Sequence, residues 1–206
     1  MMAPQLSQIA PTPPKNWVKT GKRPTNLKDY RVEFELSKKT QDDIAFLDRM
    51  SLEEVISWPI DYETNRQTFS ETSDALDMWL GGKKWRETEH NFIQFGQDGC
   101  GSLFCLWFYP DLKGEPPVVF LGSEGERALI SNSAHDFVRQ ITSGKVFFDG
   151  GWLDPDDEEK DELDWELLFK KAKSYIGSLC ENPSELTSSA QANHPDISSW
   201  IESNVE

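Results

Sequence analysis

The chain has 206 residues, of which 37% are hydrophobic and 28% are charged, and its formal net charge is −15. Eight Trp and twelve Phe supply the apolar bulk of a core, which excludes a disordered acidic chain, because such chains hold few aromatic residues. A surface this acidic repels nucleic acids and anionic membranes and attracts basic proteins or cations, so we exclude nucleic acid and membrane as partners.

The charge is divided unevenly along the chain. Residues 1–31 carry six bases and one acid, hence +5, which leaves −20 for the other 175 residues. Five prolines within residues 1–29 predict a flexible, Pro-rich basic arm. This arm lacks the features of a secretory signal, and the uncharged apolar run of residues 99–110 is too short to cross a bilayer. Together with three irregularly spaced Cys, these features indicate a soluble protein of the cytoplasm.

The first elements after the arm are a strand and two helical regions. Residues 30–36 alternate between apolar and charged side chains, which is typical of a half-buried strand. The apolar spacing in residues 42–58 predicts one or two amphipathic helices that end before the next proline. Residues 59–72 are expected to be a polar connection. A short helix should follow over residues 73–81, with Ser73 as its N-cap.

The middle of the chain predicts an antiparallel meander. Four apolar runs, separated by Gly, Asp and Pro, occupy residues 91–96, 102–109, 117–122 and 127–131. In the second run both alternating sets of side chains are apolar, so this strand should be central and covered on both faces. One set is Leu103, Cys105 and Trp107, and the other is Phe104, Leu106 and Phe108.

Two further helices are predicted towards the C-terminus. Asn132 or Ser133 should cap a helix that Gly144 ends. A long helix should begin at Asp154-Pro155 and stop at Asn182-Pro183. Its inward face lies within an arc of about 100°. The members of that face are Trp165, Leu168, Phe169, Ala172, Ile176 and Leu179. The Ser-rich residues 182–206 are expected to be weakly structured, apart from a short amphipathic piece around Ile197, Trp200 and Ile201.

The start of the long predicted helix is unusually acidic. From Asp154 to Glu166 it holds nine acids and one base. The helix dipole favours the acids of the first turn only, and those beyond it repel one another at helical spacing. The first two turns have no apolar residue to dock them, so they should project into water as an acidic spur. This run is either a solvated helix start or a surface kept anionic for a basic partner.

The sequence shows no pattern typical of a catalytic, metal-binding or phosphate-binding site. The acid run fails the EF-hand pattern, because its sixth and twelfth positions are Glu159 and Trp165, where Gly and Glu are required. Cys100, Cys105 and Cys180 have neither metal-ligand nor redox-motif spacing, and the three His lie in different kinds of segment. Residues 122–127 lack the spacing of a phosphate loop and fit a hairpin turn. We therefore predict no catalytic residue, no metal and no cofactor.

Residues 91–144 resemble the SUKH superfamily, which includes bacterial immunity proteins and fungal cell-wall synthesis regulators. The similar features are an F-x-x-F-G-x-D-G-x-G strand and turn, an apolar strand, a PVVFLGSEGE hairpin and a helix carrying DFV. The resemblance covers 54 residues, a quarter of the chain. It implies an α+β fold and a non-catalytic binding protein. Bacterial members commonly neutralise polymorphic toxins, many of them nucleases, by binding the toxin domain.

The combined expectation is an α+β fold with a mainly antiparallel, twisted sheet of about 4–6 strands, packed with helices and followed by a C-terminal amphipathic helix. Residues 1–29 form the arm, 30–181 a single SUKH-like domain and 182–206 the tail. The expected function is that of an immunity protein whose partner is a basic toxin domain. The alternatives are a regulatory scaffold with no toxin partner, and an enzyme in an unrecognised fold. On charge density alone, the expected partner-binding residues are Glu124, Glu126, Asp156, Asp157, Glu158, Glu159, Asp161 and Glu162.

Overall fold

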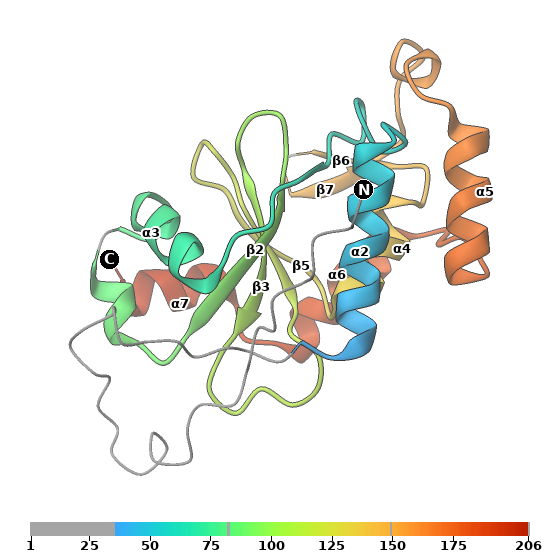
Figure 1. Cartoon of the computed structure of the whole chain (residues 1–206). Coiled ribbons are helices and arrows are strands. Elements are labelled where there is room, and N and C mark those ends of the chain that lie inside the picture. The colour runs from blue at the N-terminus through green and yellow to red at the C-terminus, as the bar shows by residue number, and fades with distance from the viewer. Residues whose placement is uncertain (1–35, 82, 149, 206) are drawn as a thin grey trace, which may run out of the picture.

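A computed structural model describes residues 36–81, 83–148 and 150–205. The predicted basic arm, and the predicted strand at residues 30–36 except for Leu36, lie outside the described residues. Within the described part, a five-stranded antiparallel sheet and a separate two-stranded hairpin are packed with six α-helices (Figure 1). The α+β class, the antiparallel sheet and the C-terminal helix predicted from the sequence are confirmed.

The main sheet follows the chain in simple order, β1-β2-β3-β4-β5. Its strands are β1 (Glu63–Thr64), β2 (Asn91–Gln97), β3 (Leu103–Phe108), β4 (Val118–Leu121) and β5 (Arg127–Ser131). The last four are the four apolar runs, so the predicted meander is confirmed. β3 pairs antiparallel with both β2 and β4 and is the central strand.

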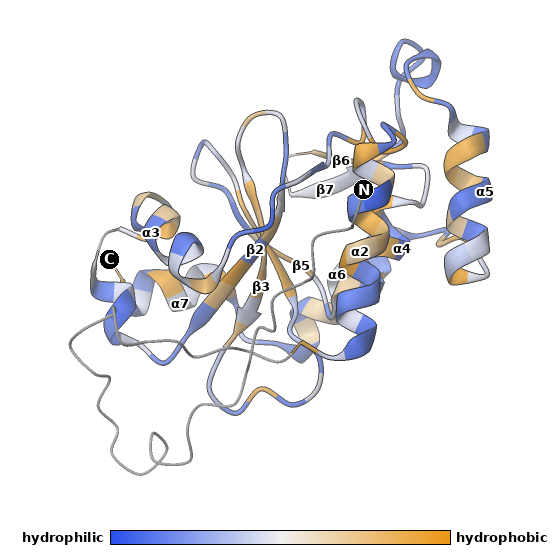
Figure 2. Cartoon of the chain, in the orientation of Figure 1, coloured by the Kyte–Doolittle hydropathy of each residue, from blue (hydrophilic) through white to orange (hydrophobic). Residues whose placement is uncertain are grey.

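Helices cover both faces of this sheet, as Figure 1 shows. One layer contains α2 (Lys38–Leu52) and α4 (Ala134–Ile141), with α5 (Trp165–Ile176) outermost. The other contains α3 (Phe69–Trp79) and α7 (Ile197–Asn204), while α6 (Pro183–Asn193) packs beside β5. The sheet therefore separates two apolar clusters, and its strands are the apolar centre of the molecule in Figure 2.

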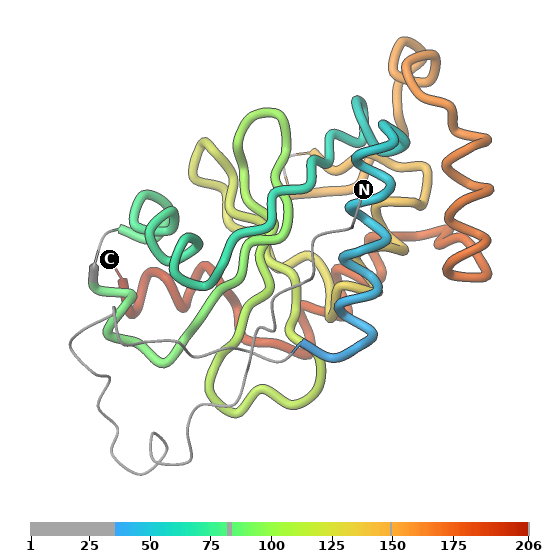
Figure 3. Tube along the Cα trace, viewed as in Figure 1, coloured from blue at the N-terminus to red at the C-terminus, as the bar shows by residue number. Residues whose placement is uncertain are grey.

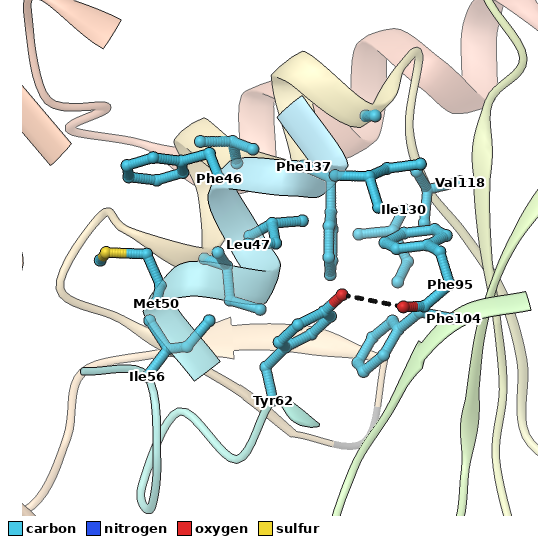
Figure 4. Close-up of a cluster of buried hydrophobic side chains, with 14 of the residues drawn as sticks. Phe46, Leu47, Met50, Ile56, Tyr62, Phe95, Phe104, Val118, Ile130 and Phe137 are labelled. Carbon is cyan, nitrogen blue, oxygen red and sulfur yellow. Dashed lines mark hydrogen bonds between the residues drawn. The ribbon is translucent and has the colours of Figure 1, made fainter. Parts of the chain in front are cut away.

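The side chains of β3 confirm the prediction that this strand is covered on both sides. Phe104 and Leu106 face the cluster under α2 and α4, where Leu47, Tyr62 and Phe137 meet them (Figure 4). The alternate set enters the second cluster with α3 and α7; this set is Leu103, Cys105 and Trp107. All five of these β3 side chains are buried.

The helix predicted over residues 73–81 begins earlier than expected. Thr68 is its N-cap, because Glu71 N donates to the Thr68 side chain and the Glu71 carboxylate accepts from Thr68 N. This reciprocal pair satisfies two backbone donors and fixes the start of α3. Ser73 was therefore the wrong N-cap and lies buried inside the helix. Residues 59–72 likewise hold β1 and the first turn of α3, where a polar connection was predicted.

The long acidic helix expected from Asp154 is also wrong in its bounds. Residues 146–153 form a hairpin of β6 (Val146–Phe148) and β7 (Gly151–Leu153), and a turn follows with a single 3-10 helix, η3 (Glu159–Asp161). The last long helix, α5, starts only at Trp165, where Asp164 caps it by accepting from Leu167 N at 2.9 Å. Helices in proteins are held mainly by a docked apolar face, and the acidic run offers none before Leu163.

The end of the chain is more ordered than its composition predicted. Residues 182–206 were expected to be weakly structured, yet they contain α6 and α7. The predicted amphipathic piece is α7, and its Ile197, Trp200 and Ile201 are buried in the second cluster. The Ser-rich α6 was missed, since it buries only Pro183 and Ala190 and shows no wide apolar stripe.

Candidate functional site

The acid run forms an exposed turn between β7 and α5, which we call the acidic turn (residues 154–164). Its core is a reciprocal pair of side chains. One oxygen of Asp156 accepts from Glu158 N and Glu159 N, both at 2.9 Å, and Glu159 Oε2 accepts from Asp156 N at 2.9 Å. The same reciprocal arrangement starts α3, but here it starts a turn that continues only as far as η3.

Most of the acidic side chains in this turn face water. Asp156, Asp157 and Glu158 are exposed, as are Asp161 and Glu162. Lys160 is the only base, and it pairs with Asp157 at 2.8 Å. That hydrogen bond and the charge of the ammonium group lower the pKa of Asp157, so its carboxylate stays ionised. The turn projects from the body of the molecule, as the trace in Figure 3 shows.

The structure separates the eight predicted partner-binding residues into two places. Six of them, from Asp156 to Glu162, lie together in the acidic turn. Glu124 and Glu126 lie instead in the turn between β4 and β5, where the Glu126 carboxylate accepts from Glu124 N at 3.2 Å. Figure 1 shows this second turn beside the β2–β3 turn, far from the acidic turn. The two glutamates are therefore not part of the same surface.

An exposed apolar pair precedes the acidic turn directly. Phe148 and Leu153 are 70% and 52% exposed, whereas their hairpin neighbours Phe147 and Trp152 pack inward with ring centroids 5.0 Å apart. Phe148 pairs with Gly151 across the hairpin, so Phe148 and Leu153 point to the same, outer side. We call this pair the hairpin face. Sequence reasoning missed it, although an apolar triplet before Gly150-Gly151 and an apolar pair after it are a recognisable hairpin signal.

Each of the three histidines has its own polar partner. Trp107 Nε1 donates to His90 Nδ1 at 3.1 Å, His135 Nδ1 lies 3.0 Å from Asp43, and His194 Nδ1 lies 2.8 Å from the Tyr109 hydroxyl. In the part of the chain that the structure describes, no cluster of three or more His, Cys, Asp or Glu could hold a metal ion. Nor is any helix there both long and apolar enough to cross a membrane.

The three cysteines differ sharply in accessibility. Cys100 is exposed in the β2–β3 turn, while Cys105 and Cys180 are buried, and burial raises the pKa of the Cys105 thiol. Since the thiolate is the reactive form, we expect one thiol per folded chain to react quickly with an aromatic disulfide reagent. The other two should react only in denaturant. A fast-reacting thiol that persists in Cys100→Ser would contradict this placement.

A polar pocket lies beside the loop that joins β3 to β4. Its volume is about 630 Å³, and its walls come from the β3–β4 loop, the residues before α4 and the end of α6. The lining residues are Tyr109, Asp111, Lys113, Glu115, Asn132, Ser133, Asn193 and His194. None of them had been singled out as a site by sequence reasoning, because they are brought together only by the fold.

Comparison with known proteins adds no relative. The chain matches no family model, and neither a curated protein nor a solved structure shows significant similarity to it.

Proposed function

We propose that the chain is a non-catalytic protein-binding module of the SUKH kind, and that it acts in the cytoplasm as an immunity protein against a basic toxin domain. The observation that supports this most is the acidic turn, which holds eight carboxylates and one base next to the exposed hairpin face. Such a surface combines an apolar contact area with a neighbouring group of negative charges.

The two parts of this surface would contribute differently to binding. Exposed carboxylates raise the rate at which an oppositely charged partner meets the right patch, above the about 10⁵–10⁶ M⁻¹s⁻¹ typical of unsteered pairs. Buried aromatic and aliphatic anchors supply most of the affinity once contact is made. Phe148 and Leu153 are suited to that second role, since their apolar surface is otherwise left in water. A basic nuclease cleft is the kind of partner that both parts would attract.

A regulatory scaffold with no toxin partner is the second candidate. The observation that favours it is the division of charge between the first 31 residues, at +5, and the rest of the chain, at −20. Two oppositely charged regions can recruit two different partners at once, which an inhibitor does not require.

Co-expression tests the proposal. The C-terminal domain of whatever protein the neighbouring gene encodes is expressed in a bacterium with and without the chain, and survival is scored. We expect the unmodified chain to rescue growth. The triple variant Glu158→Lys, Asp161→Lys, Glu162→Lys should lose rescue, because its association rate should fall by roughly 10- to 100-fold. It spares Asp156 and Glu159, whose side chains hold the turn together.

The matched control carries the same change in net charge elsewhere. Glu89→Lys, Glu181→Lys and Glu202→Lys replace three exposed glutamates outside the acidic turn and outside the predicted partner-binding set, and this triple variant should still rescue growth. Equal loss of rescue in both triple variants would mean that rescue depends on the net charge of the chain and not on the acidic turn. Rescue by both would reduce the acidic turn to a solvated segment, and a failure of the unmodified chain would favour the scaffold.

A further inference from the structure

The polar pocket offers hydrogen-bond donors and acceptors side by side, which restricts the ligands it can hold. It lies on the β3–β4 loop, at the opposite end of the molecule from the acidic turn in Figure 1. It therefore takes no part in the surface described above, and its ligand is a separate question.

One wall is a neutral pair of side chains. The Tyr109 hydroxyl and His194 Nδ1 are 2.8 Å apart. Burial raises the pKa of Tyr109 and lowers the pKa of His194, so the phenol keeps its proton and the imidazole stays neutral. In the tautomer in which the phenol donates to Nδ1, the imidazole carries its proton on Nε2. This Nε2–H makes no hydrogen bond within the described residues and is an available donor.

The pocket also holds hydrogen-bond acceptors and one further donor. Asn193 uses its amide nitrogen to donate to Asn132 Oδ1 at 3.1 Å, so its own carbonyl oxygen remains unused within the described residues. Glu115 accepts from the Thr40 hydroxyl through Oε2, which leaves Oε1 for a ligand. Asp111 adds an exposed carboxylate, and Lys113 adds an exposed ammonium group.

This mixture excludes three classes of ligand. Two carboxylates at the rim repel an anion, and the wall has no aliphatic side chain to hold an apolar molecule. A metal ion would need a cluster of ligands that the described residues do not form. A hydroxyl group, in contrast, both donates and accepts. Several hydroxyl groups on one ring would match a lining that holds both donors and acceptors, with the Tyr109 ring as an aromatic surface beside them.

We propose that this pocket binds a small neutral saccharide. The test follows backbone amide signals of the full ¹⁵N-labelled chain by NMR during titration with glucose, galactose, mannose and N-acetylglucosamine, with glycerol as the unspecific polyol. At least one sugar should shift signals of the β3–β4 loop and of the end of α6 at millimolar concentration. Glycerol should not do so.

A pair of equivalent substitutions makes the test specific. Asp111 has a φ of +62°, which Asn tolerates well, so Asp111→Asn removes the charge with little backbone strain. It should weaken sugar binding about tenfold, the usual contribution of a hydrogen bond to a charged group. Asp161→Asn, the same change in the acidic turn, should bind sugar like the unmodified chain. The proposal is overturned if no sugar shifts these signals, if glycerol shifts them equally, or if Asp111→Asn binds as tightly as its control.

Discussion

Trp200→Ala is expected to lower the free energy of unfolding by about 3–5 kcal/mol, the usual range for truncating a large core aromatic. The ring of Trp200 is stacked on His90 at 4.1 Å between centroids, and it lies 5.7 Å from Phe92 and 5.9 Å from Trp107. It is only 9% exposed. Its removal would leave a cavity between α7 and the sheet that the surrounding rings cannot close. Urea unfolding followed by Trp fluorescence or circular dichroism measures the change.

The control for this substitution lies on the same helix. Glu202 is exposed, so Glu202→Ala should change the free energy of unfolding by no more than about 0.5 kcal/mol. If Trp200→Ala were as stable as this control, α7 would not belong to the core. The tail would then be as weakly structured as the composition of residues 182–206 suggests.

The meander could be predicted because its strands are long, apolar and bounded by clear turn residues. β3 is the best example, since both of its alternating sets are apolar and both are buried. α4 was also predicted, and of its two candidate caps, Asn132 and Ser133, it is Ser133 that accepts from Asp136 N at 3.2 Å. In these elements the local signal and the tertiary packing agree.

The bounds of α5 could not be read in the same way. The dipeptide Asp154-Pro155 is a strong local signal for a helix start, but a start signal does not supply an apolar face to dock. The reciprocal bonds between Asp156 and Glu159 start a turn there, but it extends only through η3. At the other end, Gly177 adopts a φ of +82° and ends the helix five residues before the Asn182-Pro183 signal.

The strand glycine of the F-x-x-F-G pattern has a cause that only the fold reveals. A Cβ atom added to Gly96 would lie 2.4 Å from the ring of Tyr62, which is itself buried and donates to Phe95 O at 3.2 Å. The sequence shows a glycine inside a strand, which indicates a close approach by some other group. It does not show that the group is a tyrosine from the segment before β1.

The candidate site was likewise only half predictable. Charge density found the acidic turn, because acids close in sequence remain close in space. The hairpin face was missed, since its short strands were not predicted. The pocket depends on contacts such as the one between Tyr109 and His194, which are 85 residues apart. Contacts at that separation leave no periodic trace in the sequence, so residue patterns alone could not bring those side chains together.

Asp43→Ala is expected to lower the free energy of unfolding by about 3 kcal/mol, because it leaves polar groups of two other helices without their acceptor. Asp43 is 1% exposed and lies on α2. Its Oδ1 accepts from the Tyr175 hydroxyl of α5 at 2.8 Å and lies 3.0 Å from His135 Nδ1 of α4. One carboxyl group thus joins three helices, and α5 depends on it together with the stacking of Tyr175 on Phe46 at 4.2 Å.

The adjacent residue provides the control. Asp42 is exposed and, within the described residues, forms its ion pair with Lys38 of the same helix, so Asp42→Ala should cost no more than about 1 kcal/mol. Tyr175→Phe keeps the ring and loses the hydroxyl, so it should be destabilised by about 1 kcal/mol. Urea unfolding of the three variants measures these differences. A result in which Asp43→Ala matches Asp42→Ala would show that the carboxyl group does not hold α5.

The same contact predicts how stability depends on pH. Burial, followed by the hydrogen bond to Asp43 and the charge of Asp43, raises the pKa of Tyr175. A raised pKa means that the neutral phenol stabilises the fold. This contribution is complete below the unfolded pKa of about 10 and is lost as the pH rises through the higher folded value. The stability difference between the unmodified chain and Tyr175→Phe should therefore shrink above about pH 10 and stay constant below it. In Asp43→Ala the pKa of Tyr175 should fall, which absorbance of the phenolate would detect, and an unchanged phenolate titration would exclude the contact.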